Sequence, residues 1–209
     1  MRILCFDTTT RDLVVALARE GESVAGEIRP DCLKGHSEIL LPTVDRLLDQ
    51  AGLRLADLDA IAACTGPGSF TGIRIGLVTA RTFCQATGLP LLPVNSLEYR
   101  AYHVPSQKKC VALDAMQNKV YYALYEGDRE ISAPAFCEKQ ALAAKLPADT
   151  RVFADLDLPG CAREAFSALP ERLAEFALDH RSRAGNFAEV VPLYLRKCQA
   201  EESLAEKEK

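Results

Sequence analysis

Two aspartates stand where a carboxylate can bind a cation or a phosphate, each at the end of an apolar segment. Asp7 follows Ile3–Phe6 and precedes Thr8, Thr9 and Thr10, and Asp114 follows Cys110–Leu113. A carboxylate beside hydroxyl groups can hold a divalent cation and the phosphate bound to it. It can also close an Asx turn by accepting a hydrogen bond from the backbone two residues on. The Asx turn is favoured for both, and Asp7, Thr8 and Thr9 remain a candidate vestigial phosphate site.

A second candidate site is the segment TGPGSFTGIRIG at residues 65–76. It lies between a predicted strand, residues 59–64, and a helical pattern that ends at Gly88. Glycines at such a junction can direct backbone N–H groups at an anion. They can equally form a tight turn that lets the helix and the strand pack closely. The segment is not a P-loop, since no Gly-Lys-Ser/Thr follows, and Thr71 replaces the third glycine of the dinucleotide fingerprint.

The helix after this loop carries a stripe of small residues at four-residue spacing, which are Gly72, Gly76, Ala80 and Cys84. Such a stripe lets another helix approach closely. We predict that it faces a partner protein; a second helix of the same chain is the alternative. Arg74 lies in the first turn, where a cation costs about 0.3–1 kcal/mol. An acidic group of a partner, a bound nucleotide or a nearby surface carboxylate is expected to offset that cost.

The composition excludes several classes of protein. The chain has 209 residues and a net charge of −4, which argues against an independent nucleic-acid binder. No apolar stretch is long enough to span a membrane and no signal peptide is evident, so we expect a cytoplasmic protein. The eight cysteines are widely spaced and fit buried thiols in a reducing compartment. The three histidines are too dispersed for a metal cluster or a catalytic triad, and His36 is expected to cap or flank a helix.

The chain contains an internal repeat. When Asp7 is aligned on Asp114, the two strand–Asp–turn–strand units match without a gap, including Ala16-Leu17 on Ala123-Leu124. A duplication predicts two mixed-sheet α/β lobes that face each other as a pseudo-symmetric pair. We expect residues 1–103 to form the first lobe, with the glycine loop and the partner helices, and residues 104–209 to form a smaller second lobe and a tail.

The remaining elements follow from periodicity. In the first lobe a helix is predicted over 38–51, with Leu40, Val44 and Leu47 on its apolar face and Pro42 in its first turns. Further strands are predicted over 23–28 and 91–94. In the second lobe we predict a strand over 151–154 and helices over 139–145, 163–168 and 171–180.

A strand-end aspartate followed by hydroxyl residues in a duplicated lobe is typical of the actin-like ATPase (ASKHA) group. Five separate segments resemble the bacterial TsaB (YeaZ) family more narrowly. These are ILCFDTT at 3–9, His36-Ser37-Glu38 before Leu41-Pro42, GPGSFTGIRIG at 66–76, Asp114-Ala115 before Val120-Tyr121, and PLYLR at 192–196. The resemblance covers nearly all of the first lobe and is patchy from 133 to 187.

The resemblance implies a role in forming threonylcarbamoyladenosine beside the anticodon of tRNA. The TsaD-type catalytic subunit of that system has a metal motif, Asn-His-x-x-x-His, which matches Asn95–Arg100 here with Ser96 and Arg100 in place of the histidines. Neither side chain can replace an imidazole on a transition metal. The resemblance therefore implies a chain without catalytic residues or a metal.

We accordingly expect a non-catalytic assembly subunit that binds a TsaD-type subunit through the helices near 38–51 and 73–87. The expected interface residues are Leu40, Val44, Leu47, Gly72, Arg74, Gly76, Ala80 and Cys84. The resemblance also implies a TsaE-type ATPase in the full complex, a homodimer when the chain is alone, tRNA contact only through the complex, and ATP or ADP near the subunit interface, with no cofactor on the isolated chain. The alternative function is a small ATP-dependent phosphotransferase that uses Asp7 and the glycine loop.

Overall fold

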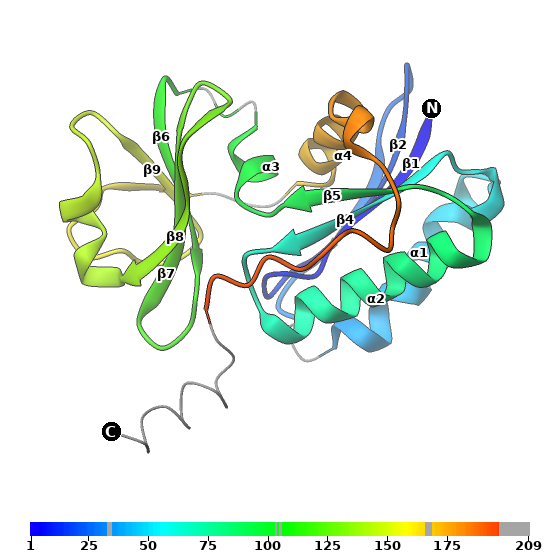
Figure 1. Ribbon diagram of the computed structural model, residues 1–209, viewed down its shortest axis with the longest axis horizontal. Coiled ribbons are helices and arrows are strands. Elements are labelled where there is room, and N and C mark those ends of the chain that lie inside the picture. The colour runs from blue at the N-terminus through cyan, green and yellow to red at the C-terminus, as the bar shows by residue number, and fades with distance from the viewer. Residues whose placement is uncertain (33–34, 103, 105, 166–168, 197–209) are drawn as a thin grey trace.

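The computed structural model describes residues 1–32, 35–102, 104, 106–165 and 169–196, and its elements form two lobes (Figure 1). Each lobe is built on a five-stranded mixed sheet. The first sheet has the order β3-β2-β1-β4-β5, with β1 (Arg2–Asp7), β2 (Leu13–Arg19), β3 (Ala25–Arg29), β4 (Ala60–Gly66) and β5 (Leu91–Asn95). The second has the order β10-β9-β6-β7-β8, with β6 (Lys108–Asp114), β7 (Lys119–Glu126), β8 (Arg129–Glu138), β9 (Arg151–Ala154) and β10 (Arg163–Ala165).

The two sheets have the same topology. In the first, β1 pairs antiparallel with β2 and parallel with β4, while β2 pairs with β3 and β4 with β5. The second repeats these pairings with β6, β7, β8, β9 and β10 in the same roles. Asp7 lies opposite Val14 and Asp114 opposite Val120, so the two aspartates hold equivalent places. The predicted duplication and the two-lobed actin-like fold are confirmed.

Helices cover both faces of the first sheet. Alternate strand residues such as Leu4 and Phe6 pack under α1 (His36–Gln50) and α2 (Phe70–Thr87), in a core that includes Leu40, Val44 and Ala80. The intervening residues pack under α4 (Pro170–Asp179) and the short α3 (Glu98–Ala101). A sheet that is buried on both faces explains the nearly continuous apolar character of β1, β2 and β4.

The ends of α2 follow from its sequence. The Ser69 hydroxyl accepts a hydrogen bond from the Gly72 N–H at 3.2 Å and caps the first turn. Gly88 takes a left-handed conformation with φ of +76°, and its N–H bonds the Cys84 carbonyl, which ends the helix. The helix predicted over 38–51 is confirmed as α1, with Pro42 in its second turn.

The second lobe is reduced in the part of the chain that the structure describes. One face of its sheet packs only against 3-10 turns, η2 (Lys139–Ala141) and η3 (Ala143–Lys145), and the loop near Leu158. The helix predicted over 139–145 is thus two 3-10 turns. The helix predicted over 163–168 is wrong at its start, because residues 163–165 pair with β9 as β10, and 166–168 lie outside the described residues. Strand pairing outweighs helical propensity in so short a segment.

The boundaries of the two lobes differ from the predicted ones, which are 1–103 for the first lobe and 104–209 for the second. Residues 170–193 return to the first lobe, where α4 packs on β1, β2 and β3 (Figure 1). Leu173 and Phe176 are fully buried there, and Gly26 of β3 lies so close to Pro170 that an added Cβ would be 2.2 Å from its ring. The sheet needs a cover on this face, and residues 1–103 supply only part of it. The charged segment 201–209, which the sequence predicts to be a solvated tail, lies outside the described residues.

Among the described residues the seven cysteines are free, and Cys5, Cys64, Cys84 and Cys110 are buried. None of the helices in the described part of the chain combines the length and the hydropathy needed to cross a membrane.

Candidate functional site

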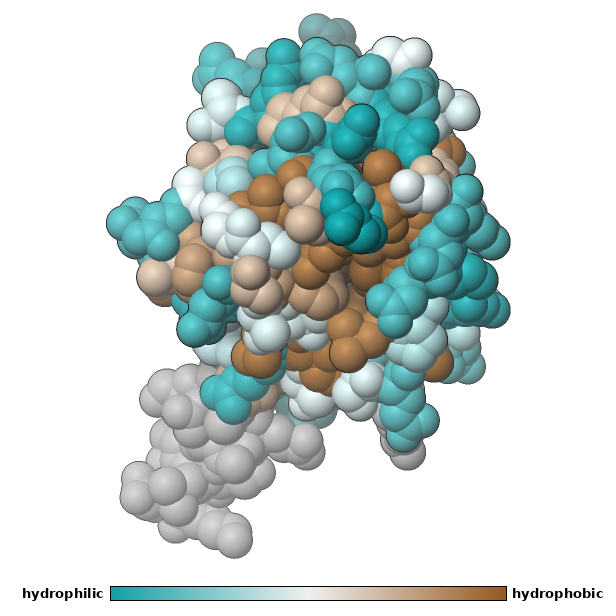
Figure 2. Space-filling view, turned by 90° about the vertical axis from the view of Figure 1, so that its right-hand side faces the viewer, coloured by the Kyte–Doolittle hydropathy of each residue, from teal (hydrophilic) through white to brown (hydrophobic). Residues whose placement is uncertain are grey.

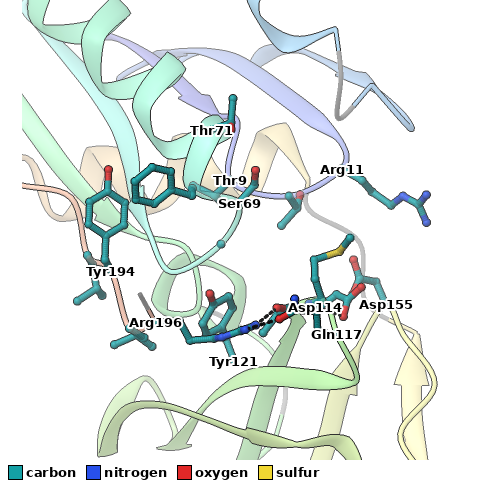
Figure 3. A pocket seen from close by; sticks show the side chains of 17 residues that line it. Thr9, Arg11, Ser69, Thr71, Asp114, Gln117, Tyr121, Asp155, Tyr194 and Arg196 are labelled. Atoms are coloured by element: carbon teal, nitrogen blue, oxygen red, sulfur yellow. Dashed lines mark hydrogen bonds between the residues drawn. The ribbon is translucent and has the colours of Figure 1, made fainter. Parts of the chain in front are cut away.

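A pocket of about 550 Å³ lies between the two lobes. Figure 3 shows that its walls come from the turn after β1, the start of α2, the turn after β6 and the segment near Tyr194. The residues that line it are Thr9, Thr10, Arg11, Gly68, Ser69, Phe70, Thr71, Asp114, Ala115, Met116, Gln117, Tyr121, Asp155, Leu193, Tyr194, Leu195 and Arg196. Of the candidate phosphate site, only Thr9 lines the pocket.

Asp7 lies behind the pocket wall, in the core, with no exposed surface. One carboxylate oxygen accepts hydrogen bonds from the backbone N–H and the hydroxyl of Thr9, at 2.7 and 2.6 Å. The other accepts from the Tyr99 hydroxyl at 2.6 Å and pairs with the Arg100 guanidinium at 2.7 Å. The backbone bond is the Asx turn favoured from the sequence, and the remaining bonds leave the carboxylate fully engaged.

The electrostatics of this cluster favour the charged pair. Burial alone would raise the pKa of the Asp7 carboxyl, but the Arg100 guanidinium and the hydrogen bonds from Thr9 and Tyr99 outweigh it and hold that pKa below its usual value. Burial also raises the pKa of the Tyr99 hydroxyl, so this group stays protonated and donates to Asp7. The Asp7–Arg100 pair is therefore ionised inside the core.

The two positions that correspond to the metal histidines are used internally. The Ser96 hydroxyl donates to the Pro67 carbonyl in the glycine loop. Arg100 donates to the Ser96 carbonyl at 2.9 Å and to the Thr10 hydroxyl at 3.3 Å, besides its contact with Asp7. Within the described ranges, no group of three or more His, Cys, Asp or Glu residues could hold a metal ion.

Asp114 differs from its counterpart Asp7. Its side chain is exposed, lines the pocket, accepts from the Met116 N–H at 3.1 Å in a second Asx turn, and pairs with Lys139 at 3.1 Å. The duplication into two facing lobes predicts that Asp7 and Asp114 oppose each other across the cleft. This is wrong for Asp7, because Arg100 and Tyr99 hold its carboxylate in the core.

The glycine-rich loop at residues 65–76 packs closely against the turn after β1. A Cβ at Gly68 would lie 2.2 Å from the Thr9 carbonyl oxygen, and one at Gly72 would lie 1.9 Å from that of Thr8. The Ser69 N–H donates to the Thr9 carbonyl at 2.7 Å, and the Thr8 hydroxyl donates to the Gly72 carbonyl at 2.7 Å. Of the two interpretations left open, close packing of turn and helix accounts for these glycines.

Most of the expected interface residues are buried within the chain itself. Ala80 and Cys84 have no exposed surface and pack under the first sheet. Gly72 and Gly76 are buried against Thr8. The same core holds Leu40, Val44 and Leu47, each at most 4% exposed. The small-residue stripe thus faces the chain's own sheet, and of the expected set only Arg74 is exposed.

Arg74 has partners that the sequence reasoning missed. Its Nε donates to the Tyr194 hydroxyl at 3.1 Å, and its guanidinium lies 3.9 Å from the centre of the Phe70 ring. The rings of Phe70 and Tyr194 stack at 4.7 Å. In the part of the chain that the structure describes, the Arg74 guanidinium in the first turn of α2 contacts two aromatic side chains and no carboxylate. The PLYLR motif was the available signal, but nothing in its spacing indicated which helix it meets.

His36 flanks its helix as expected, since it is the first residue of α1, and it is buried. Burial lowers the pKa of its imidazole despite the nearby Asp7 carboxylate. It does not line the pocket.

The chain is similar to proteins of tRNA modification. Residues 23–149 match the sequence profile of the family described as "TsaD: tRNA N6-adenosine threonylcarbamoyltransferase". The tRNA threonylcarbamoyladenosine biosynthesis protein TsaB of Escherichia coli is 36% identical over 133 residues, which cover 61% of this chain and 56% of that protein. An uncharacterized protein of Mycobacterium tuberculosis is 34% identical over 214 residues, with coverage of 95% and 93%.

Solved structures show the same family likeness as the sequence relatives. YeaZ from Pseudomonas aeruginosa superposes with a TM-score of 0.75 at 26% identity, covering 93% of this chain and 99% of that one. The alignments with the first curated TsaB relatives span little more than half of their length. From the profile match, the near full-length relative and the shared structure, the chain belongs to the TsaB (YeaZ) family.

Proposed function

We propose that this chain takes part in tRNA threonylcarbamoyladenosine biosynthesis as a non-catalytic subunit that binds and supports a TsaD-type catalytic subunit. The observation that carries the non-catalytic role is the buried Asp7–Arg100 pair. A carboxylate already neutralised by a guanidinium and bonded by Thr9 and Tyr99 has no lone pair directed at the pocket. This favours the assembly role over the alternative phosphotransferase, which needs that carboxylate for a metal.

The surface proposed for the partner is the outer side of α1 and α2. Leu41 of α1 is 47% exposed and Val78 of α2 is 63% exposed, with Ile39 and Ile75 half-buried. Figure 2 shows that hydrophobic residues gather on the side of the first lobe. Exposed apolar groups that cluster on a monomer are typical of protein interfaces. The partner face therefore uses other residues of the two expected helices than the small-residue stripe.

Membership of the TsaB (YeaZ) family is what extends the proposal to the wider assembly. In the complete complex we propose a TsaE-type ATPase, ATP or ADP near the subunit interface, and tRNA contact only through the complex. When the partner is absent, we propose that the same helix surface forms a homodimer. The isolated chain is proposed to need no cofactor.

The partner surface is tested by Val78→Arg and Leu41→Arg, with Ile131→Arg in β8 of the second lobe as the control. Ile131 is also exposed, at 43%, so all three variants should fold. An arginine in a desolvated interface costs enough to lower affinity about 30-fold or more. We expect the first two variants to lose co-purification with the organism's TsaD-type subunit while the control keeps it. Native affinity in both would place the interface elsewhere.

The non-catalytic role is tested on the purified chain. We expect no threonylcarbamoyl transfer without the partner, no ATP hydrolysis, and no stoichiometric zinc or iron by elemental analysis of chelator-free protein. Transfer should appear when the TsaD-type subunit is added. One bound transition metal per chain, or turnover of ATP by the chain alone, would overturn the proposal.

A further inference from the structure

The segment after α4 is fixed along the first lobe before it reaches the pocket. Gly185 exchanges two backbone hydrogen bonds with Leu91 of β5, at 2.9 and 3.1 Å. The Arg81 side chain of α2 donates to the Val190 carbonyl, and the Leu193 N–H donates to the Thr65 carbonyl at 2.8 Å. Up to Leu193 this segment is therefore part of the first lobe.

The next three residues cross to the second lobe. Tyr194 stays on the first lobe, stacked on Phe70 and bonded by Arg74. Leu195 is half-buried and packs against the core of the second lobe. Arg196 donates to the Ala115 carbonyl and to the Gln117 side-chain oxygen, the latter at 2.7 Å, in the turn after β6. Figure 3 shows Tyr194 and Arg196 side by side on one wall of the pocket.

This crossing limits the distance between the lobes. Three residues of extended chain span roughly 10 Å at most. The start of α2 and the turn after β6 thus cannot separate far while both ends of the crossing stay bound. Both ends also lie at the pocket, where Tyr194 is 38% exposed.

We propose that residues 193–196 form a latch that holds the two lobes closed over the pocket between them. The anchor on the first lobe is the Arg74–Tyr194–Phe70 stack, and the anchor on the second is the pair of hydrogen bonds from Arg196. Neither anchor is part of the sheets, so the latch can open while both lobes stay folded. Opening exposes the pocket walls at Ser69–Thr71 and Ala115–Gln117 together.

The test uses the full chain with Tyr194→Ala, Arg196→Met and the double variant. The matched control is Val191→Ala, in the same segment but 70% exposed and not a member of either anchor. Dyes on unnatural amino acids at Asp49 in α1 and Arg129 in β8 report the distance between the lobes by energy transfer. Amide hydrogen exchange reports the opening of the pocket walls.

We expect the double variant to lower the transfer efficiency and to speed amide exchange at residues 69–71 and 115–117 roughly tenfold or more, because each anchor is worth about one net hydrogen bond or aromatic contact. The single variants should lie between, and Val191→Ala should match the native chain. Tyr194→Phe keeps the stack and should have the smallest effect. If the double variant unfolds, energy transfer and amide exchange in the single variant Arg196→Met decide whether the latch exists. Native transfer and native exchange in the folded variants would overturn the latch.

Discussion

Asp7, Tyr99 and Arg100 form a charged cluster in the core of the first lobe. Three hydrogen-bond donors and one guanidinium satisfy both oxygens of the carboxylate. A buried ion pair is costly to form but more costly to break, since removing one partner leaves an uncompensated charge. The cluster therefore fixes how the turn after β1 and the short helix α3 meet.

Replacing Arg100 by methionine should destabilise the chain by about 3–5 kcal/mol, because Asp7 keeps its burial and loses its counterion. Urea unfolding followed by circular dichroism measures the change. The control is Arg11→Met: Arg11 also pairs with an aspartate, Asp31, but both side chains are largely exposed. That variant should unfold at nearly the native midpoint. Equal effects of the two substitutions would contradict a structural role for the buried pair.

The same cluster should make stability depend on acid. Because the pKa of Asp7 is lowered in the fold, its contribution is fully present above the unfolded pKa of about 4 and is lost as the pH falls toward the lower folded value. Asp7→Asn removes this titration while keeping the shape of the side chain. We expect the difference in unfolding free energy between native and variant chains to shrink from pH 6 to pH 3. A difference that stays constant with pH would count against an ionised Asp7.

At the scale of elements, the glycine-rich loop and the turn after β1 have complementary shapes and pack directly on each other. Gly68 in the loop and Gly72 in α2 allow the carbonyls of Thr9 and Thr8 to approach closely, and the Ser69 N–H and the Thr8 hydroxyl donate the hydrogen bonds between the two segments. The stripe of small residues thus serves close packing inside the first lobe. The exposed side of α2 is left for other contacts.

Gly72→Ala tests this packing, since its Cβ would lie 1.9 Å from the Thr8 carbonyl oxygen. Backbone must move to admit it, so we expect a loss of about 1–3 kcal/mol or more and a clearly lower melting temperature. Gly185→Ala is the control, because no atom lies within 4 Å of its added Cβ. It should change stability by no more than about 0.5 kcal/mol. A native melting temperature for Gly72→Ala would refute the close approach.

Much of this arrangement could be predicted from the sequence. The repeat of strand, aspartate and turn gave the two sheets, and apolar periodicity gave α1, α2 and α4 close to their observed ends. Which neighbour the small-residue stripe of α2 packs against could not be predicted, because small residues allow a helix, a sheet or a turn to approach equally well. Nor could the Asp7–Arg100 pair, since its two members are joined only by the fold. Pairing of β10 with β9 likewise depends on a neighbour distant in the sequence.

At the scale of the molecule, the chain leaves the first lobe and returns to complete it. The linker after α3 is held by Lys109, whose ammonium group is buried and donates to the carbonyls of Ala101 and Val104 and to Asp128. Burial lowers the pKa of this group. The chain comes back as α4 and then crosses again at residues 193–196. The first lobe is thus built from both ends of the sequence.

A fragment of residues 1–103 should therefore fail to fold. Without α4, the face that holds Ile3, Cys5 and Val14 is left largely uncovered, and an apolar sheet face in water is unstable. Circular dichroism and proton NMR of the fragment check this. Adding a peptide of residues 169–196 should restore folded signals by supplying the missing cover. A cooperative melt of the fragment alone would show that the first lobe needs no return of the chain.

Arg74 belongs at once to the outer side of α2 and to the stack that anchors Tyr194. A ligand on that side which withdraws the guanidinium from Tyr194 favours separation of the lobes by a fixed coupling free energy. Thermodynamic linkage makes the effect reciprocal: whatever wedges the lobes apart tightens that ligand by the same factor. Binding at the outer side of α2 and the separation of the two lobes at the pocket are therefore coupled through Arg74.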